Sequence, residues 1–202
     1  MSVHMRASWR HGAAIGSLFC LVASIPSMAG AQGSAAAASA APLPPIVHSA
    51  AECAVWRREL SFAKSVEAHD ARAFAAHLHP GAVFNAGSRS PLRGGEVVAQ
   101  AWAGIVEGKE FILRWRPGVV AIGGDPNIAL SRGPSFSETP GAEPKERYKV
   151  GFFQSVWVRD AASGEWRILF DRADGPQRPV ASADDGRAHL TAQSSEDCVT
   201  SK

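Results

Sequence analysis

The sequence lacks the features that would assign a function directly. It has no nucleophile elbow, no phosphate-binding loop and no Cys-x-x-Cys pair, so it offers no standard hydrolase, nucleotide-binding or redox motif. Basic and acidic side chains nearly balance, at 21 against 19, so we expect neither nucleic acid nor an anionic membrane surface as a partner. The apolar run at residues 13–23 is shorter than the roughly 20 residues that a membrane-spanning helix needs.

That apolar run fits a signal peptide instead. Arg6 and Arg10 precede it without any acidic residue, and the small-x-small sequence Ala29-Gly30-Ala31 follows it. We therefore predict that residues 1–31 are a signal peptide cleaved after Ala31, and that the protein is periplasmic or secreted.

Cysteine is scarce, and one of the three, Cys20, lies in the predicted signal peptide. Cys53 and Cys198 remain, and an even pair in an oxidising compartment favours a disulfide. For a loop of about 100 residues the chain-entropy model gives a stabilisation of roughly 4 to 5 kcal/mol. The alternative is two free thiols, one buried on a helix and one in a loose tail.

The remaining chain divides by composition. Residues 32–48 are rich in Ala, Ser and Pro without periodicity, which predicts a linker. Periodic patterns fill residues 49–175, a length that suits one domain. Residues 176–202 are polar and irregular, and we expect them to form a disordered C-terminal tail.

Helices are expected in the first half of this domain. A capping box beginning at Ser49 starts a helix that runs to about Ala68. Asp70 can cap a short second helix, which His79-Pro80-Gly81 would end. A third helix is expected over residues 96–107, where apolar residues recur at helical spacing.

Strand patterns dominate the second half, and the clearest is YKVGFFQSVWVRDAASGEWRILFDRADG at residues 148–175. Its residues alternate with a period of two on both sides of a turn that ends in Gly164, which predicts a β-hairpin. The alternation puts Asp171 on the face opposite Trp166, Ile168 and Phe170. Helices followed by antiparallel strands give an α+β fold. Shorter strands are expected at residues 82–85, 111–116, 119–122 and 128–131.

The order of these elements resembles a known family. Residues 70–84, the sequence Pro91-Leu-Arg-Gly, a helix with Trp102 and the hairpin from Gly151 to Asp171 are similar to the nuclear transport factor 2-like superfamily. The closest resemblance is to its SnoaL-like, ketosteroid isomerase-like and domain-of-unknown-function 4440 branch, over roughly residues 50–174. It implies a cone-shaped, cystatin-like roll, in which a curved antiparallel sheet wraps around N-terminal helices and leaves a pocket at the wide end. It also implies a homodimer through the sheet face.

The resemblance does not bring a catalytic set. Ketosteroid isomerase-like members carry a general-base Asp at the end of the first short strand, where this chain has Asn85 or Ala86, and neither side chain can abstract a proton. The only tyrosine, Tyr148, lies on a late strand and not on the first helix. The resemblance therefore favours a binding protein over an enzyme.

Candidate ligand-binding residues follow from the implied pocket, which aromatic and hydrogen-bonding side chains would line. A carboxylate in such a pocket would have a raised pKa and could act as an acid or base, which makes Asp171 a weak catalytic candidate. Its alternative role is an ion pair with Arg114, Arg147 or Arg172. The candidate ligand-binding residues are Asn85, Trp102, Trp115, Ser131, Gln154 and Asp171; Trp157 is expected in the core.

His77 and His79 are the remaining candidates for chemistry. Side chains at i and i+2 on a helix diverge, and no third ligand stands nearby in sequence, so we predict no metal site and no cofactor. We predict an exported protein that binds a small apolar molecule. The alternative is a lyase or isomerase that uses Asp171 or a histidine such as His77 as its acid or base.

Overall fold

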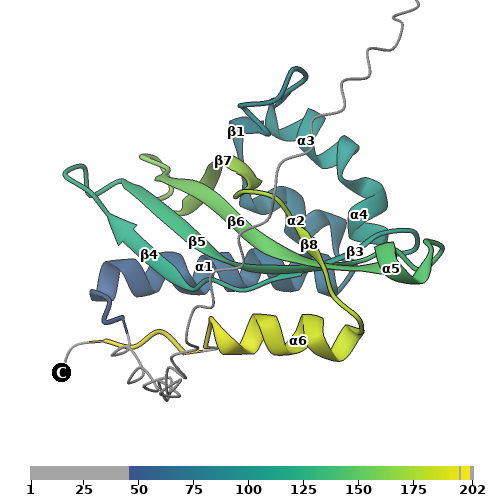
Figure 1. Cartoon of the computed structure of the whole chain (residues 1–202). Coiled ribbons are helices and arrows are strands. Elements are labelled where there is room, and N and C mark those ends of the chain that lie inside the picture. The colour runs from purple at the N-terminus through teal and green to yellow at the C-terminus, as the bar shows by residue number, and fades with distance from the viewer. Residues whose placement is uncertain (1–45, 196, 201–202) are drawn as a thin grey trace, which may run out of the picture. The chain divides into compact units, whose positions relative to one another are not determined.

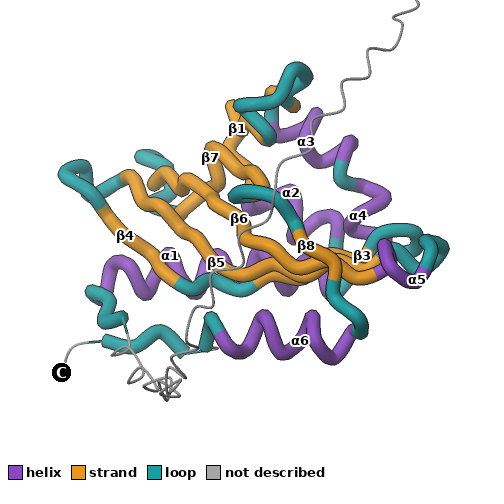
Figure 2. The backbone as a smooth tube through the Cα atoms, in the orientation of Figure 1, coloured by secondary structure: helices purple, strands orange, loops and turns teal. Residues whose placement is uncertain are grey.

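The computed structural model describes residues 46–195 and 197–200, which belong to one compact unit. The expected signal peptide at residues 1–31, and all but the last three residues of the expected linker, lie outside the described residues. The described part contains one mixed sheet with helices packed against it (Figures 1 and 2), which confirms the α+β class. Within these ranges, no helix combines the length and the apolar character needed to cross a membrane.

The N-terminal helices begin and end near the positions that their capping residues predict. α1 (Ala50–Glu67) starts at Ser49, where the capping box with Glu52 is formed. α2 (Ala71–His77) is capped by the side chain of Asp70, which accepts a hydrogen bond from the amide of Ala73. The expected third helix is split at Trp102 into α3 (Gly95–Ala101) and α4 (Ala103–Glu107).

Eight strands form the sheet, in the order β2-β1-β7-β6-β5-β3, with β4 paired to β5 and β8 paired to β6. Most pairs are antiparallel, but β1 runs parallel to β7, so the sheet is mixed rather than purely antiparallel as expected. His79-Pro80-Gly81 lies inside β1 and does not merely end a helix. The strands are β1 (Leu78–Phe84), β2 (Leu92–Arg93), β3 (Ile112–Trp115), β4 (Val119–Ile122), β5 (Ile128–Glu138), β6 (Tyr148–Arg159), β7 (Trp166–Ala173) and β8 (Arg178–Pro179); a one-turn helix, α5 (Pro144–Arg147), precedes β6.

The expected hairpin is present as β6 and β7, but a bulge changes its two faces. Ser155 pairs with Asp171 and Val156 pairs with Phe170, whereas the next residue of β6, Trp157, pairs with Ile168. β7 therefore has one extra residue, Leu169, and such a bulge reverses the side-chain alternation beyond it. Asp171 consequently faces the same side as Ile168. The simple alternation in the sequence placed it on the opposite face, and that prediction is wrong.

The main core lies between α1 and the face of the sheet that carries Trp157 and Ile168, which we call the inner face. α1 contacts β3, β4 and β5, and side chains from these elements form one hydrophobic cluster. Trp157, expected in the core, is fully buried. The aromatic members pack edge to face and in stacks, for example Phe62 against Phe74 with ring centroids 5.1 Å apart.

The outer face of the sheet is partly covered by the C-terminal segment. We expected disorder after residue 175, but the structure has β8 and then α6 (Ala183–Ala192), capped by Ser182 (Figure 1). Leu190 of α6 packs with Phe136 and Val150 in a second, smaller cluster. The apolar stripe of α6 is thin, which is why its sequence pattern does not stand out.

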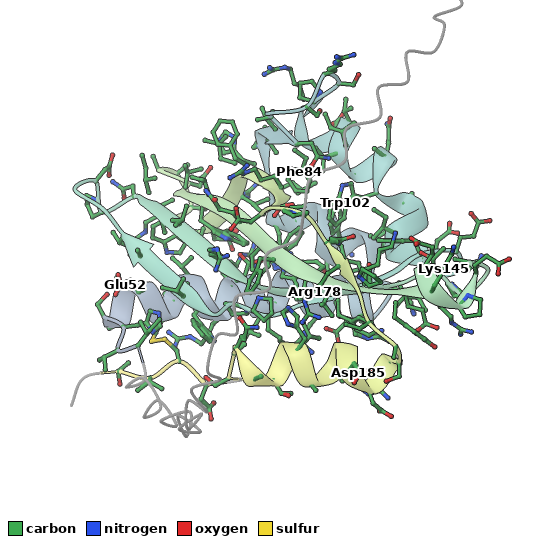
Figure 3. All side chains as sticks on the ribbon, in the orientation of Figure 1. Glu52, Phe84, Trp102, Lys145, Arg178 and Asp185 are labelled. Carbon is green, nitrogen blue, oxygen red and sulfur yellow. A yellow bond between two sulfur atoms is a disulfide. The ribbon has the colours of Figure 1, made fainter. Side chains whose placement is uncertain are left out.

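A disulfide joins Cys53 of α1 to Cys198 in the C-terminal segment, as one of the two alternatives predicted. Figure 3 shows this bond in yellow beside the first turn of α1. The backbone adds to the attachment, because His48 and Thr200 form a parallel bridge and the amide of His48 donates to the carbonyl of Val199 at 2.8 Å. The two ends of the described chain are therefore held together.

Candidate functional site

A pocket of about 170 Å³ opens on the inner face of the sheet, between α1, β3, β6, β7 and the α3–α4 junction. Its lining is mainly aromatic and aliphatic. Trp102 packs edge to face against Phe84, with ring centroids 5.3 Å apart, and both residues are labelled in Figure 3. The lining residues are Phe62, Asn85, Trp102, Phe111, Leu113, Trp115, Ser135, Phe152, Phe153, Asp171, Arg172, Ala173 and Gln177.

Asp171 supplies the only carboxyl group of this lining. The bulge at Leu169 turns its side chain inward, where the hydroxyl of Ser155 donates a hydrogen bond of 2.9 Å to its Oδ2. Burial, and then the negative charge of Glu59, raise the pKa of Asp171 to about 7, although the bond from Ser155 opposes the shift. A carboxyl group with this pKa exists in both its protonated and ionised forms at neutral pH.

The ion pairs that sequence offered as an alternative for Asp171 do not form. Arg147 pairs with Glu138, and Arg172 lies 3.5 Å from Asp174. Among the described residues, Asp171 takes part in no salt bridge. Its negative charge is therefore balanced by a hydroxyl group and not by a guanidinium.

Three of the other proposed ligand-binding residues also line the pocket. Trp115 is buried and Trp102 is half-buried, and their rings meet edge to face with centroids 6.5 Å apart. Asn85 is exposed at the end of β1, and its backbone N–H donates a hydrogen bond of 2.8 Å to the backbone carbonyl of Asp171. The position where the sequence lacks a general base therefore lies directly beside the strand that carries Asp171.

Ser131 and Gln154 lie outside the pocket lining. Ser131 is fully buried on β5, where it is the register partner of Ser155 on β6. Gln154 accepts a hydrogen bond of 3.2 Å from Arg172, and its neighbour Ser155 points to the opposite, inner face. The sequence placed both on the right strands but did not resolve their depth.

Glu59 is a functional candidate that sequence reasoning missed. Its side chain is fully buried, and its two oxygens accept hydrogen bonds from the indole nitrogens of Trp115, at 2.8 Å, and Trp157, at 2.7 Å. Burial raises the pKa of Glu59, although the hydrogen bonds to it oppose the shift. The helical spacing could have revealed it, because residue 59 lies three after Trp56 and four before Ala63, on the apolar stripe of α1.

His77 is a buried structural residue and does not line the pocket. Its Nδ1 lies 2.6 Å from the carbonyl oxygen of Ala73, and its Nε2 lies 3.1 Å from Oγ of Ser61. Burial, and then the charge of Arg58, lower the pKa of His77 to about 4, so the ring is neutral at pH 7. His79 accepts a hydrogen bond from the amide of Gly81, and no group of three ligating side chains occurs in residues 46–195 and 197–200.

A second cavity, of about 300 Å³, lies between β3 and α6 and is lined mostly by charged and hydroxyl-bearing residues. Three arginines line it, but Arg116 pairs with Glu67 and Arg187 pairs with Asp184. Most of its positive charge is therefore already neutralised, and none of the candidate residues reaches it. The pocket around Asp171 remains the better candidate site.

Comparison with known proteins identifies the fold. No family model matches the sequence, and no curated protein matches it. Many solved structures are similar, among them three with TM-scores of 0.50 or 0.51. One is a nuclear transport factor 2-like protein of unknown function from Pseudomonas putida KT2440, with a TM-score of 0.51 and 15% identity over 65% of this chain and 90% of that chain.

The other two come from Novosphingobium aromaticivorans. A candidate scytalone dehydratase has a TM-score of 0.51 and 12% identity over 64% of this chain and 87% of its own. A candidate aromatic ring hydroxylase has a TM-score of 0.50 and 14% identity over 63% of this chain and 91% of its own. At these identities the likeness establishes the nuclear transport factor 2-like fold that the resemblance implied, and any chemistry must come from the residues of this pocket.

Proposed function

We propose that this chain, on its nuclear transport factor 2-like fold, binds a small, largely apolar molecule in the pocket, with Asp171 as the ligand's polar partner. The observation that carries this proposal is a single carboxyl group set into an aromatic and aliphatic lining. Such a combination is typical of ligand sites, where apolar walls supply affinity and a few polar groups fix orientation.

The size of the pocket narrows the ligand class. An apolar cavity of about 150 Å³ is large enough to hold benzene, and this pocket measures about 170 Å³. One ring therefore fits inside. Larger substituents would extend to the mouth, where Asn85, Arg172 and Gln177 are exposed.

The polar group of the ligand is set by the protonation of Asp171. With its pKa raised to about 7, this side chain donates a hydrogen bond to a carbonyl oxygen when protonated. When ionised, it accepts one from a hydroxyl group. We therefore propose a monocyclic ketone, aldehyde, alcohol or phenol as the ligand class.

We also propose that the protein works outside the cytoplasm. The signal-peptide pattern at residues 1–31 supports export, and the disulfide between Cys53 and Cys198 suits an oxidising compartment. Proteins that bind small apolar molecules there can take them from the surrounding medium.

A homodimer through the sheet face stays a prediction. α6 covers part of the outer face over Phe136, but Ile128, Leu130 and Phe170 on the same face are 46%, 37% and 40% exposed. Exposed apolar side chains grouped on one face of a sheet are typical of interaction surfaces. Analytical ultracentrifugation of the wild type and of Leu130→Lys would show whether this face forms a dimer.

Acid or base catalysis by Asp171 is the second candidate function. The observation that favours it is the raised pKa of Asp171, because an acid or base works best when its pKa lies near the working pH. A lyase or isomerase would need no further cofactor for a proton transfer at this group.

The proposal is tested by calorimetric titration with 4-methylphenol, cyclohexanone and cyclohexanol. Leu113→Trp should fill the pocket and abolish binding, and Asp171→Ala should weaken binding about tenfold or more through loss of one charged or neutral hydrogen bond. Gln154→Ala is the matched control, because Gln154 is on the same hairpin but outside the lining.

Binding of these ring compounds by Leu113→Trp with wild-type affinity would disprove the pocket as their site. The catalytic candidate requires more. A ligand that binds must also be converted by the wild type, and Asp171→Asn must stop the conversion while retaining binding.

A further inference from the structure

The acidic side chain of Glu59 lies in the core behind the pocket with no exposure to solvent. Each of its oxygens already accepts one indole N–H, from Trp115 and from Trp157. No arginine, lysine or histidine forms a salt bridge with it among the described residues. An ionised carboxylate without a cationic partner is costly in such a place, so the neutral form is favoured.

Two buried serines on the inner face of the sheet lie close to Glu59. Ser155 on β6 stands two residues before Trp157, whose indole binds Glu59, and Ser131 on β5 is the register partner of Ser155. Both serines oppose the rise in the pKa of Glu59. By strict hydrogen-bond geometry the hydroxyl of Ser131 has no partner, whereas Ser155 donates to Asp171 at 2.9 Å. Because Ser155 donates its only hydroxyl hydrogen to Asp171, its oxygen is available to accept a hydrogen bond from the protonated carboxyl group of Glu59.

We propose that Glu59 and Asp171 form a coupled carboxyl pair bridged by the hydroxyl of Ser155, in which Glu59 is the positioning residue that keeps one proton on the pair. With the shared proton on Glu59, the hydrogen bonds would run from Glu59 to Ser155 and from Ser155 to Asp171. With the proton on Asp171, the same chain would run in the reverse direction, from Asp171 to Ser155 and from Ser155 to the ionised Glu59. Two buried carboxyl groups whose charges act on one another do not both ionise readily.

The basic side chains around this pair bind other groups and neutralise neither carboxyl group. Arg172, the one cation of the pocket lining, pairs with Asp174, as does Arg132 from β5. On α1, Arg58 donates to the carbonyls of Trp166 and Ala76, and on α2 the ring of His77 is held by Ala73 and Ser61. The serine hydroxyls and the indoles are therefore the groups that compensate the two carboxyls.

The functional meaning of the pair rests on the proposed function of the pocket. A pair that retains one proton near neutral pH presents Asp171 to a ligand as a donor or as an acceptor. The same pocket could then bind a carbonyl compound and a hydroxyl compound at nearly the same pH. Trp115 contributes as well, because its indole both lines the pocket and holds Glu59.

The test follows the two carboxyl groups by carbon-13 NMR across a pH titration of the protein without ligand. Glu59→Gln removes the second negative charge, so the titration midpoint of Asp171 should fall by about one pH unit or more. Ser155→Ala removes the bond that stabilises ionised Asp171, so its midpoint should rise. Ser137→Ala is the matched control, because it removes another buried hydroxyl of β5 that acts on neither carboxyl group, and the midpoint should stay at its wild-type value.

Wild-type protein gives a further readout that needs no substitution at position 59. The carboxyl resonance of Glu59 should move in step with the titration of Asp171. If it does not move, and if Ser155→Ala leaves the midpoint of Asp171 unchanged, the coupling is disproved even where Glu59→Gln fails to fold. None of these measurements involves a ligand, so the coupling and the ligand binding can fail separately.

Discussion

Glu59 on α1 and Trp115 on β3 are joined by a hydrogen bond of 2.8 Å from the indole nitrogen to the carboxyl group. The pocket wall is thereby attached to a buried acid of the core. Trp115→Phe keeps an aromatic ring but leaves one buried oxygen of Glu59 without its donor. We expect a loss of about 1 to 3 kcal/mol in the free energy of unfolding, measured by urea denaturation.

Trp102→Phe is the control for that substitution. Trp102 lines the same pocket, but its indole nitrogen makes no side-chain hydrogen bond in the part of the chain that the structure describes. Its replacement should therefore cost less than the replacement of Trp115. Equal losses at both positions would show that ring volume, and not the bond to Glu59, determines the effect.

The buried His77 should make the protein less stable in acid. Its pKa falls from 6.5 to about 4 on folding, so between these values the unfolded chain binds a proton that the folded chain does not. Stability is therefore lost as the pH falls from about 6.5 to 4, by roughly 3 kcal/mol for this side chain. His77→Gln should flatten this part of the curve of unfolding free energy against pH, and an unchanged slope would contradict the prediction.

Asp171 should have the opposite effect over nearly the same pH range, from about 3.8 to 7. Its pKa rises from 3.8 to about 7 on folding, so the folded chain binds the extra proton and its contribution to stability is lost as the pH rises through 7. Asp171→Asn cannot ionise, and it should unfold at higher urea concentration than the wild type at pH 8 but not at pH 4. Partial exposure of Asp171 limits the gain to a few kcal/mol at most. Equal effects at the two pH values would exclude ionisation as the cause.

The disulfide between Cys53 and Cys198 should contribute substantially to stability. It closes a loop with a sequence separation of 145 residues, for which the chain-entropy model gives up to about 5 kcal/mol. We expect the melting temperature of the wild type to fall on addition of a reductant. The double variant Cys53→Ser with Cys198→Ser serves as the control, because its melting temperature should not respond to the reductant at all.

The packing of α6 on the sheet depends on a glycine. A Cβ atom at Gly186 would lie 2.3 Å from the ring of Phe136, so Gly186→Ala should displace α6 and destabilise the protein by about 1 to 3 kcal/mol. Gly104→Ala on α4 is the matched control, since a Cβ atom there meets no other atom within 4 Å. The control should be neutral or stabilising, because alanine favours a helix. A similar loss at both positions would mean that the contact with Phe136 is not the cause.

The sequence predicted those parts of the fold that depend on local patterns. The capping box at Ser49, the cap at Asp70 and the turn at Gly164 all occur where their residue types favour them. The bulge at Leu169 has no such signal, because no glycine or proline marks it and the alternation of residue types continues across it. The orientation of Asp171 therefore could not be derived from the sequence.

The candidate site was only partly predictable for a similar reason. Trp102, Trp115, Asn85 and Asp171 follow from the implied pocket and do line it. Glu59 comes from a helix far away in sequence, and its role depends on indole donors from two separate strands. α6 likewise depends on long-range packing, since it is held by Phe136 and Val150 rather than by a strong periodic pattern of its own.

The bond between Cys53 and Cys198 also has a consequence for proteolysis. All strands and all helices except the first turn of α1 lie between the two cysteines. A protease that cuts a single peptide bond in an exposed loop of this interval, such as residues 123–127, leaves two fragments that remain covalently joined. The pocket residues of the two fragments would stay linked through the disulfide. The protein can therefore tolerate such a cut in the presence of proteases, as long as the disulfide stays oxidised.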